Sequence, residues 1–377
     1  MLRSLFAAVV LIHGLIHLLG FVKEWNLMPV NQLSGRTLIP LGEAFTKVAG
    51  ALWLAAFLCF AIAAAGFLLR TDWWWMAGAA AVLLSQLLIV LYWKDAWAGT
   101  IANVIILPVV IVAYGTWSFD RMVRNEVTAL LEPTSGAAPE IVTRDMLRGL
   151  PPVVQNWLEQ SNVVGSKKVH TVRLKQKGTM RTKPNGSWLP FEAEQYFTIG
   201  KPAFIWKAAI HAAPFIDIVG RDKYSDGKGN MLIKLLSLKT IADSKGDEMN
   251  QGTLLRYLAE VCWFPAAALS DYLTWEALDS NSARVTMSYA GVSASGVYRF
   301  NAQGQLVGFE AQRYGEFDGK YSLEPWSIVM KAQKPFNGVT LPYASEVTWK
   351  LKTGDYTWLR LEITDLEYDT PEMYRTD

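Results

Sequence analysis

The sequence is poor in charged residues and in cysteine, and both shortages exclude classes of protein. Charged residues make up 19% of the 377 positions, whereas about a quarter is usual for a soluble globular chain. Two cysteines in the whole chain cannot form the disulfide framework of a small secreted domain. The 36 basic and 34 acidic residues nearly balance, so we expect no basic surface for nucleic acid.

The shortage of charge is concentrated in residues 1–125, which hold only eight of the basic and five of the acidic residues. Four stretches there contain no charged residue, and each is at least 18 residues long. About 20 helical residues cross the hydrocarbon core of a bilayer. The sequence therefore predicts a four-helix transmembrane domain over 1–125, with helices at about 5–22, 48–69, 73–93 and 96–119.

The number of predicted spans is even, so both termini are expected on the same side of a bacterial cytoplasmic (inner) membrane. Basic residues flank both ends of the helices in equal number, and the positive-inside rule therefore does not specify that side.

Four polar residues within the predicted spans form a candidate membrane site: His13, His17, Gln86 and Asn103. The two histidines are four residues apart, so they share one helix face. Such a pair is compatible with a haem site, a metal site or a proton relay, and also with ordinary hydrogen bonding between helices. Because the chain has only two other histidines, both outside the spans, we favour hydrogen bonding and predict no metal ligands and no cofactor.

Residues 126–142 contain two prolines, a serine and a glycine, which predicts a linker. The aqueous domain at 143–377 is expected to be mostly antiparallel β. Eleven segments alternate apolar and polar residues between turn signals. If the first two pair, the basic outer face of one (Arg173, Lys175 and Lys177) can meet the acidic outer face of the other (Glu192 and Glu194). That many strands suit a curled sheet or half barrel.

One helix is expected inside this β domain, over residues 253–269. Its apolar stripe leaves Arg256 and Glu260 outside, and Pro265 is expected to kink or restart the helix. Capping a curled sheet, such a helix would enclose either a filled core or a ligand cavity. The candidate ligand-binding residues on this helix and the facing strands are Phe204, Trp206, Leu258, Trp263 and Phe264.

Known catalytic motifs are missing from the sequence. No phosphate-binding loop and no dinucleotide fingerprint occurs, and the run from Gly291 to Gly296 departs from a nucleophile elbow at its fifth position. Asp222, Asp226 and Gly227 match a calcium loop only in part, so a hairpin turn explains them better. We predict no catalytic residues and lean away from an enzyme.

Three stretches carry a resemblance to a known family: HGLIHLLGFVKEW at 13–25, SQLLIVLYWKDAWAGTIANVIIL at 85–107 and LRYLAEVCWFPAAAL at 255–269. They resemble a family of uncharacterised bacterial multi-pass membrane proteins whose aqueous part is a domain of unknown function. That resemblance implies no activity, cofactor or catalytic residue. The pattern after residue 168 is similar in outline to the lipoprotein-carrier fold, a curled antiparallel sheet capped by helices that holds acyl chains.

These observations lead to three functional hypotheses. The first is a membrane-anchored protein whose β domain binds a lipid, acyl chain or similar amphiphile. The second is a membrane redox or metal-binding protein that uses His13 and His17. The third is a non-enzymatic membrane assembly or scaffold factor without a small ligand. The sequence identifies no protein partner.

Overall fold

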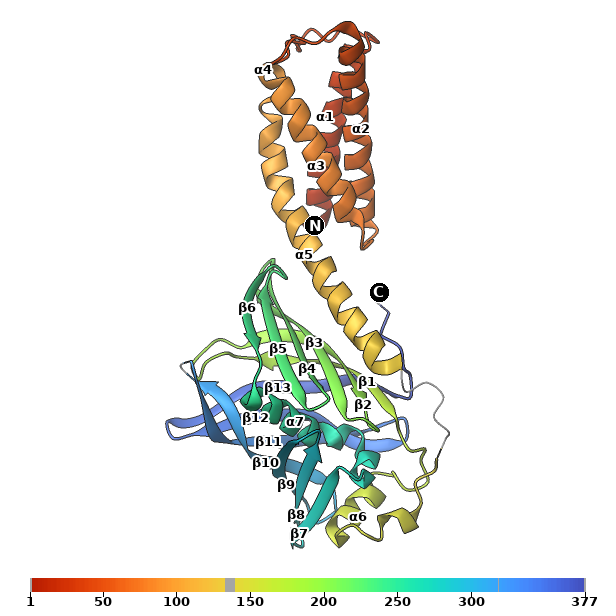
Figure 1. The fold of residues 1–377 in the computed structure, drawn as a ribbon, viewed down its shortest axis with the longest axis vertical. Helices are drawn as coiled ribbons and strands as arrows, with labels where there is room; N and C mark the ends of the chain where they lie inside the picture. The colour runs from red at the N-terminus through yellow and green to blue at the C-terminus, as the bar shows by residue number, and fades with distance from the viewer. Residues whose placement is uncertain (1, 133–139, 318, 376–377) are drawn as a thin grey trace. The chain divides into compact units, whose positions relative to one another are not determined.

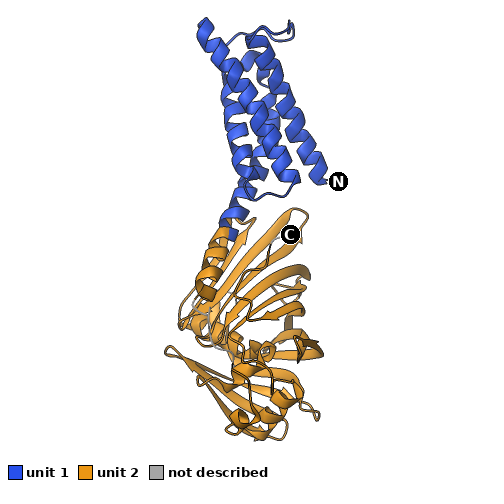
Figure 2. Cartoon of the chain, turned by 90° about the vertical axis from the view of Figure 1, so that its right-hand side faces the viewer, with its two compact units in different colours: residues 1–120 blue, residues 121–377 orange. Residues whose placement is uncertain are grey.

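A computed structural model describes residues 2–132, 140–317 and 319–375. The chain divides into two compact units, Met1–Asp120 and Arg121–Asp377, which Figure 2 distinguishes by colour. The first unit is helical and the second is mostly antiparallel sheet. The predicted fold class, four apolar helices followed by a curled β domain, is therefore confirmed.

Four helices of the described residues are long and apolar enough to cross a membrane. A short fifth helix, α4, follows α3. The bounds are α1 (Leu2–Glu24), α2 (Glu43–Leu68), α3 (Trp74–Leu91), α4 (Trp93–Ala96) and α5 (Gly99–Leu131). Because α5 continues to Leu131, the beginning of the expected linker at 126–142 is helical, and its residues 133–139 lie outside the described residues.

Glycines let the first two helices approach closely. A Cβ added at Gly14 would lie 2.7 Å from Phe60, and one added at Gly20 would lie 2.6 Å from the ring of Trp53. Real side-chain carbons do not come so close, so any larger residue at these positions would push α1 away from α2. Small residues at helix interfaces are a usual way to pack helices in lipid, where the hydrophobic effect does not drive association.

The second unit contains one 13-stranded sheet in which every named pair is antiparallel. The strands are β1 (Thr171–Met180), β2 (Leu189–Thr198), β3 (Ala203–Ala213), β4 (Ile216–Ser225), β5 (Lys228–Leu235), β6 (Lys239–Ser244), β7 (Leu273–Asp279), β8 (Ser282–Tyr289), β9 (Val292–Phe300), β10 (Leu306–Phe317), β11 (Lys320–Phe336), β12 (Val339–Leu351) and β13 (Gly354–Tyr368). The order across the sheet is β6-β5-β4-β3-β2-β1-β13-β12-β11-β10-β9-β8-β7. The first and last strands of the chain therefore meet in the middle, and β6 and β7 form the two edges (Figure 1).

The predicted pairing of the first two strands is confirmed by the register. Lys175 lies opposite Glu194, and Lys177 lies opposite Glu192. The hairpin between β4 and β5 turns at Asp226 and Gly227, which have φ angles of 51° and 74°. Two consecutive positive φ angles are typical of a type I′ turn, and Asp with Gly is a favoured pair for it. The hairpin interpretation of this partial calcium motif is therefore confirmed.

One helix, α7 (Asp247–Glu260), lies in the segment that connects the two edge strands, and it packs against strands from both arms of the sheet. Two short 3-10 helices follow, η3 (Val261–Trp263) and η4 (Pro265–Leu269). The expected restart at Pro265 is therefore confirmed, although the helix begins earlier than predicted. Two further short helices, η2 (Arg144–Leu147) and α6 (Pro152–Gln160), precede the sheet.

Three tyrosine hydroxyls bond α7 and η3 to the sheet, two from buried residues and one from the half-buried Tyr368. The hydroxyl of Tyr298 on β9 donates to the carbonyl of Leu258 at 2.8 Å. The hydroxyl of Tyr257 donates to the carbonyl of Thr198 at 3.0 Å, and that of Tyr368 donates to the carbonyl of Trp263 at 2.7 Å. These bonds satisfy polar groups that would otherwise be costly to bury, and they hold the cap in one position.

Candidate functional site

A large cavity lies in unit 2, with walls formed by the sheet and by α7 with η3. Its volume is about 970 Å³, near the upper end of the roughly 300–1,000 Å³ usual for small-molecule sites. Aromatic and aliphatic side chains form most of its wall, among them Trp206, Trp263, Trp326, Ile328, Met330 and Trp349. An apolar molecule could therefore be removed from water here.

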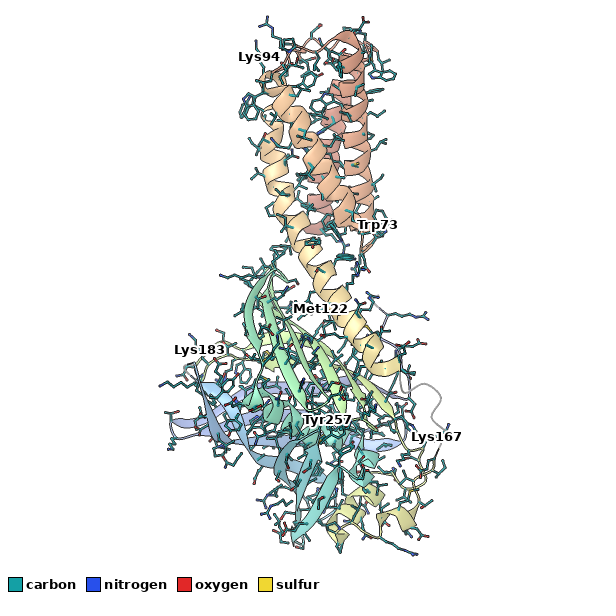
Figure 3. All side chains as sticks on the ribbon, in the orientation of Figure 1. Trp73, Lys94, Met122, Lys167, Lys183 and Tyr257 are labelled. Atoms are coloured by element: carbon teal, nitrogen blue, oxygen red, sulfur yellow. The ribbon has the colours of Figure 1, made fainter. Side chains whose placement is uncertain are left out.

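The cavity reaches the surface at hairpin loops. Exposed lining residues come from three connections: Lys183 between β1 and β2, Gly319 between β10 and β11, and Thr353 between β12 and β13. In Figure 3, Lys183 lies at the left edge of unit 2, and Tyr257 on α7 lies near its middle. A ligand thus has a way in that does not require α7 to leave the sheet.

The five candidate ligand residues separate into two groups. Trp206 and Trp263 line the cavity. Phe204, Leu258 and Phe264 are fully buried in the core and do not line it. Phe264 packs against Phe197, with ring centroids 4.9 Å apart. The apolar pattern identified inward-facing positions, but it could not distinguish a filled part of the interior from an empty one.

A charged cluster on α7 belongs to the cavity and corrects one sequence expectation. Arg256 and Glu260 were placed outside the apolar stripe of the helix, yet both line the cavity. Arg256 Nε donates to Glu260 Oε1 at 2.8 Å, and its Nη1 donates to Asp222 Oδ2 at 2.7 Å. The side chains of the two acids are only 10% exposed, and that of Arg256 is 18% exposed. Asp222 on β4 supplies the second carboxylate that makes the burial of Arg256 possible. The positions of Asp222 and Arg256 in the sequence do not indicate that the two residues meet.

The pKa directions in this cluster follow from burial and pairing. Burial raises the pKa of the Glu260 carboxyl, although Arg256 and the amide of Gln195 oppose that shift. Burial by itself would lower the pKa of Arg256, but the carboxylates of Glu260 and Asp222 raise it overall. The cation is therefore firmly held in its charged form.

Two glutamines extend the cluster: Gln176, which lines the cavity, and Gln195, which is fully buried behind its wall. Gln195 Nε2 donates to Glu260 Oε2 at 2.7 Å. Trp206 Nε1 donates to Gln176 Oε1 at 2.8 Å. The guanidinium of Arg256 also lies over the Trp206 ring, 4.9 Å from its centroid. The polar side chains near α7 are thus bonded to one another and hold Trp206 in place.

Arg313 on β10 is another of the cations that line the cavity. Its guanidinium lies 4.9 Å from the ring centroid of Trp326 and 5.6 Å from that of Trp349. Its Nε donates to the carbonyl of Gly252 on α7 at 3.3 Å. Burial lowers the pKa of Arg313 to about 10, which still leaves it charged at neutral pH. No sequence pattern marked this residue, because its importance depends on facing an open space.

The four candidate membrane residues come together in unit 1. His13 Nε2 lies 3.0 Å from Asn103 Oδ1, and His17 Nε2 lies 2.8 Å from Ser85 Oγ. Asn103 Nδ2 donates to both Ser85 Oγ and Gln86 Oε1, each at 3.0 Å. The network joins α1, α3 and α5, as expected for hydrogen bonding between helices. Ser85 completes this hydrogen-bond network, and no sequence pattern distinguishes it from other serines.

The histidine pair lies beside a second, smaller cavity of about 270 Å³ within unit 1. Both ring nitrogens of His17 are occupied, since Nδ1 bonds the carbonyl of His13 at 2.8 Å. The described residues contain no group of three or more His, Cys, Asp or Glu side chains placed to hold a metal ion.

A model for a family of unknown function, DUF6544, matches residues 140–361. The chain belongs to the DUF6544 family. The family resemblance expected from the sequence is therefore confirmed, and the matched range contains all the cavity elements named above. No curated protein matches the chain.

Solved structures similar to this DUF6544 chain share little sequence with it. One is a domain described as an outer membrane lipoprotein-sorting protein from Vibrio parahaemolyticus (11% identity, TM-score 0.35, covering 60% of this chain and 94% of that one). Another is a LolA superfamily protein from Nitrosomonas europaea (9%, 0.33, 59% and 94%). A third is a DUF1329 family protein from Desulfovibrio piger (12%, 0.34, 59% and 94%).

Proposed function

We propose that this chain is a membrane-anchored protein that binds a lipid, acyl chain or similar amphiphile in the cavity of unit 2. The observation that carries the proposal is the cavity itself, about 970 Å³ with a mostly aromatic and aliphatic wall. Charged and amide side chains are gathered next to α7. A molecule with an apolar chain and a polar head matches both parts.

We also propose that the helices of unit 1 anchor the protein in a bacterial cytoplasmic membrane. Their length and apolar composition support this, and so do tryptophans at their ends, including Trp73, Trp93 and Trp97. Membrane anchoring would keep the binding unit close to a source of amphiphiles.

The test uses the full chain in lipid nanodiscs and a photoactivatable long-chain fatty acid with the reactive group at its alkyl end. After irradiation, labelled peptides are mapped by mass spectrometry. We expect saturable labelling of peptides from β3, β4, β11 and α7, and competition by unlabelled palmitic acid. Labelling confined to the helices of unit 1, which contact any lipid-dissolved probe, would contradict the proposal.

A cavity-filling variant makes this test specific. Gly220 on β4 lines the cavity, and a Cβ added there would come no closer than 3.7 Å to another group, the ring of Trp206. Gly220→Val therefore places bulk in the cavity without a backbone clash and should reduce labelling of unit 2 several-fold. Gly149→Val is the matched control, because Gly149 is exposed with nothing near its added Cβ.

A further inference from the structure

We infer that the amphiphile has an anionic headgroup, a carboxylate or a phosphate, and that Arg313 binds it. This inference rests on the proposed function and specifies its ligand class. It assigns different roles to two of the four arginines that line the cavity, with Arg256 neutralised within the protein and Arg313 available to a ligand.

The first support is the distribution of carboxylates. Asp222 and Glu260 both bond Arg256, at 2.7 and 2.8 Å. No carboxylate of the described residues lies within 4.0 Å of the Arg313 side-chain nitrogens; the bond of this side chain is the one from Nε to the Gly252 carbonyl. A cation in such a place is costly unless something pairs with it. Asp222 and Glu260 favour its charge only from farther away, so a bound anion would supply the partner at ion-pair distance.

The second support is the way in which Arg313 is held. The rings of Trp326 and Trp349 lie next to its guanidinium, and both rings also line the cavity. Cation–π contacts restrict the planar group, and Nε is fixed on α7. The terminal nitrogens remain free to donate, and their fork geometry suits two oxygens of one carboxylate or phosphate.

The third support is the wall beside this cation. Ile328 and Met330 line the cavity on β11, the strand next to the one that carries Arg313, and Val347 lines it on β12, one strand further on. A ligand whose head pairs with Arg313 can therefore lay an apolar chain against these side chains. A small inorganic anion would leave that surface unused, so the geometry favours an amphiphile over a free ion.

The experiment measures competition on the full chain in nanodiscs, with photoactivatable palmityl alcohol as a neutral probe. Competitors are palmitic acid, palmitoyl lysophosphatidic acid, palmityl alcohol and inorganic phosphate, with the lipids compared at equal mole fraction. On the natural protein we expect at least one of the two anionic lipids to compete roughly tenfold better than the alcohol, the usual scale of a charged hydrogen bond. Which of the two does so identifies the headgroup.

Variants assign that preference to one residue. Arg313→Gln should remove the preference for the anionic lipid while the alcohol still labels and competes, which shows that the cavity remains folded. Arg313→Lys keeps the charge without the fork and should retain part of the preference. Arg284→Gln, which removes a cation paired with Glu276 on the exposed face of β8, should change nothing.

Three results would overturn the inference. The first is equal competition by palmitic acid, lysophosphatidate and palmityl alcohol. The second is a preference for the anionic lipid that survives in Arg313→Gln. The third is displacement of the probe by inorganic phosphate alone, at the concentration at which lysophosphatidate displaces it. In all three the cavity is still labelled, so the proposed function stands. A cavity that is not labelled by the alcohol or by the fatty acid would instead contradict the proposed function.

Discussion

Arg256 is a buried cation whose two carboxylate partners are buried with it. Removing only the cation would leave Asp222 and Glu260 as like charges with little access to water. Breaking such a pair usually costs about 3–5 kcal/mol. We therefore expect Arg256→Met to lower the free energy of unfolding by about that amount, measured by urea denaturation of the full chain followed by tryptophan fluorescence.

The matched control is Arg284→Met. Arg284 pairs with Glu276 at 2.8 Å, but the two side chains are 48% and 62% exposed. Exposed pairs contribute about 0–1 kcal/mol, so this change should be nearly neutral. Equal losses for the two variants would show that burial of the Arg256 cluster has no energetic weight.

Glu260 gives the cluster a pH dependence. Burial raises the pKa of its carboxyl in the folded chain, so in the window just above the ordinary glutamate pKa the folded state binds more protons than the unfolded state. The stability that the Glu260 carboxyl contributes is therefore present below that window, and it is lost as the pH rises through the pKa of Glu260 in the folded chain. The melting temperature of the natural protein minus that of Glu260→Gln should fall across this window. A difference that rises with pH would mean that Arg256 outweighs burial.

The cap formed by α7 and η3 is fixed by side-chain hydrogen bonds, which makes it a stable wall of the cavity. Tyr298 is fully buried, and its hydroxyl donates to the Leu258 carbonyl. Tyr298→Phe keeps the ring contacts with Trp157 and Phe309 and removes only the hydroxyl, with its bond to Leu258 and a longer one of 3.5 Å to the Ala259 carbonyl. We expect a loss of about 1 kcal/mol in urea denaturation. Tyr321→Phe, which changes an exposed tyrosine on β11, should have no measurable effect.

The elements that the sequence predicted best are those with a strong local signal. Charge-free runs identified the four long helices, and alternation identified eleven of the strands. The sequence missed β6 and β7, the two edges of the sheet. Neither shows clean alternation of burial, since β6 has no buried residue and β7 has only Leu273. An edge strand has a neighbour on one side alone, so its residues need not follow the apolar pattern.

The site was harder to predict than the fold because its residues meet only through long-range pairing. Arg256 and Glu260 were noticed as a helical pair, but their burial depends on Asp222, 34 positions away. Arg313 differs from the other cations of the strands in that it faces the cavity without a carboxylate partner among the described residues. No local sequence pattern encodes the position of a cavity. Trp206 and Trp263 were chosen by size and placement, and both line the cavity; large apolar side chains that face inward are what composition and periodicity can indicate.

At the scale of the whole molecule, the boundary between unit 1 and unit 2 lies inside a helix, α5. Unit 2 begins at Arg121, so it includes the last residues of α5 (Figure 2). Glu126 there forms ion pairs with Arg221 at 3.0 Å and Lys223 at 2.6 Å on β4. We therefore expect residues 121–377 to fold independently, and we expect a fragment that starts just after the predicted linker, 143–377, to be too short.

This boundary predicts a difference between the two fragments. The shorter one loses Val123, Val127 and Leu131, all buried, and each such side chain contributes roughly 1.5–3 kcal/mol by burial. It also leaves the Arg221 cation without its Glu126 partner. Burial already disfavours the charged form of Arg221 and lowers its pKa, and Glu126 opposes that shift. We expect 121–377 to be soluble with a cooperative thermal transition by circular dichroism, and 143–377 to aggregate or to unfold with at least about 3 kcal/mol less stability. Equal stability of the two fragments would mean that the end of α5 contributes nothing to the stability of unit 2.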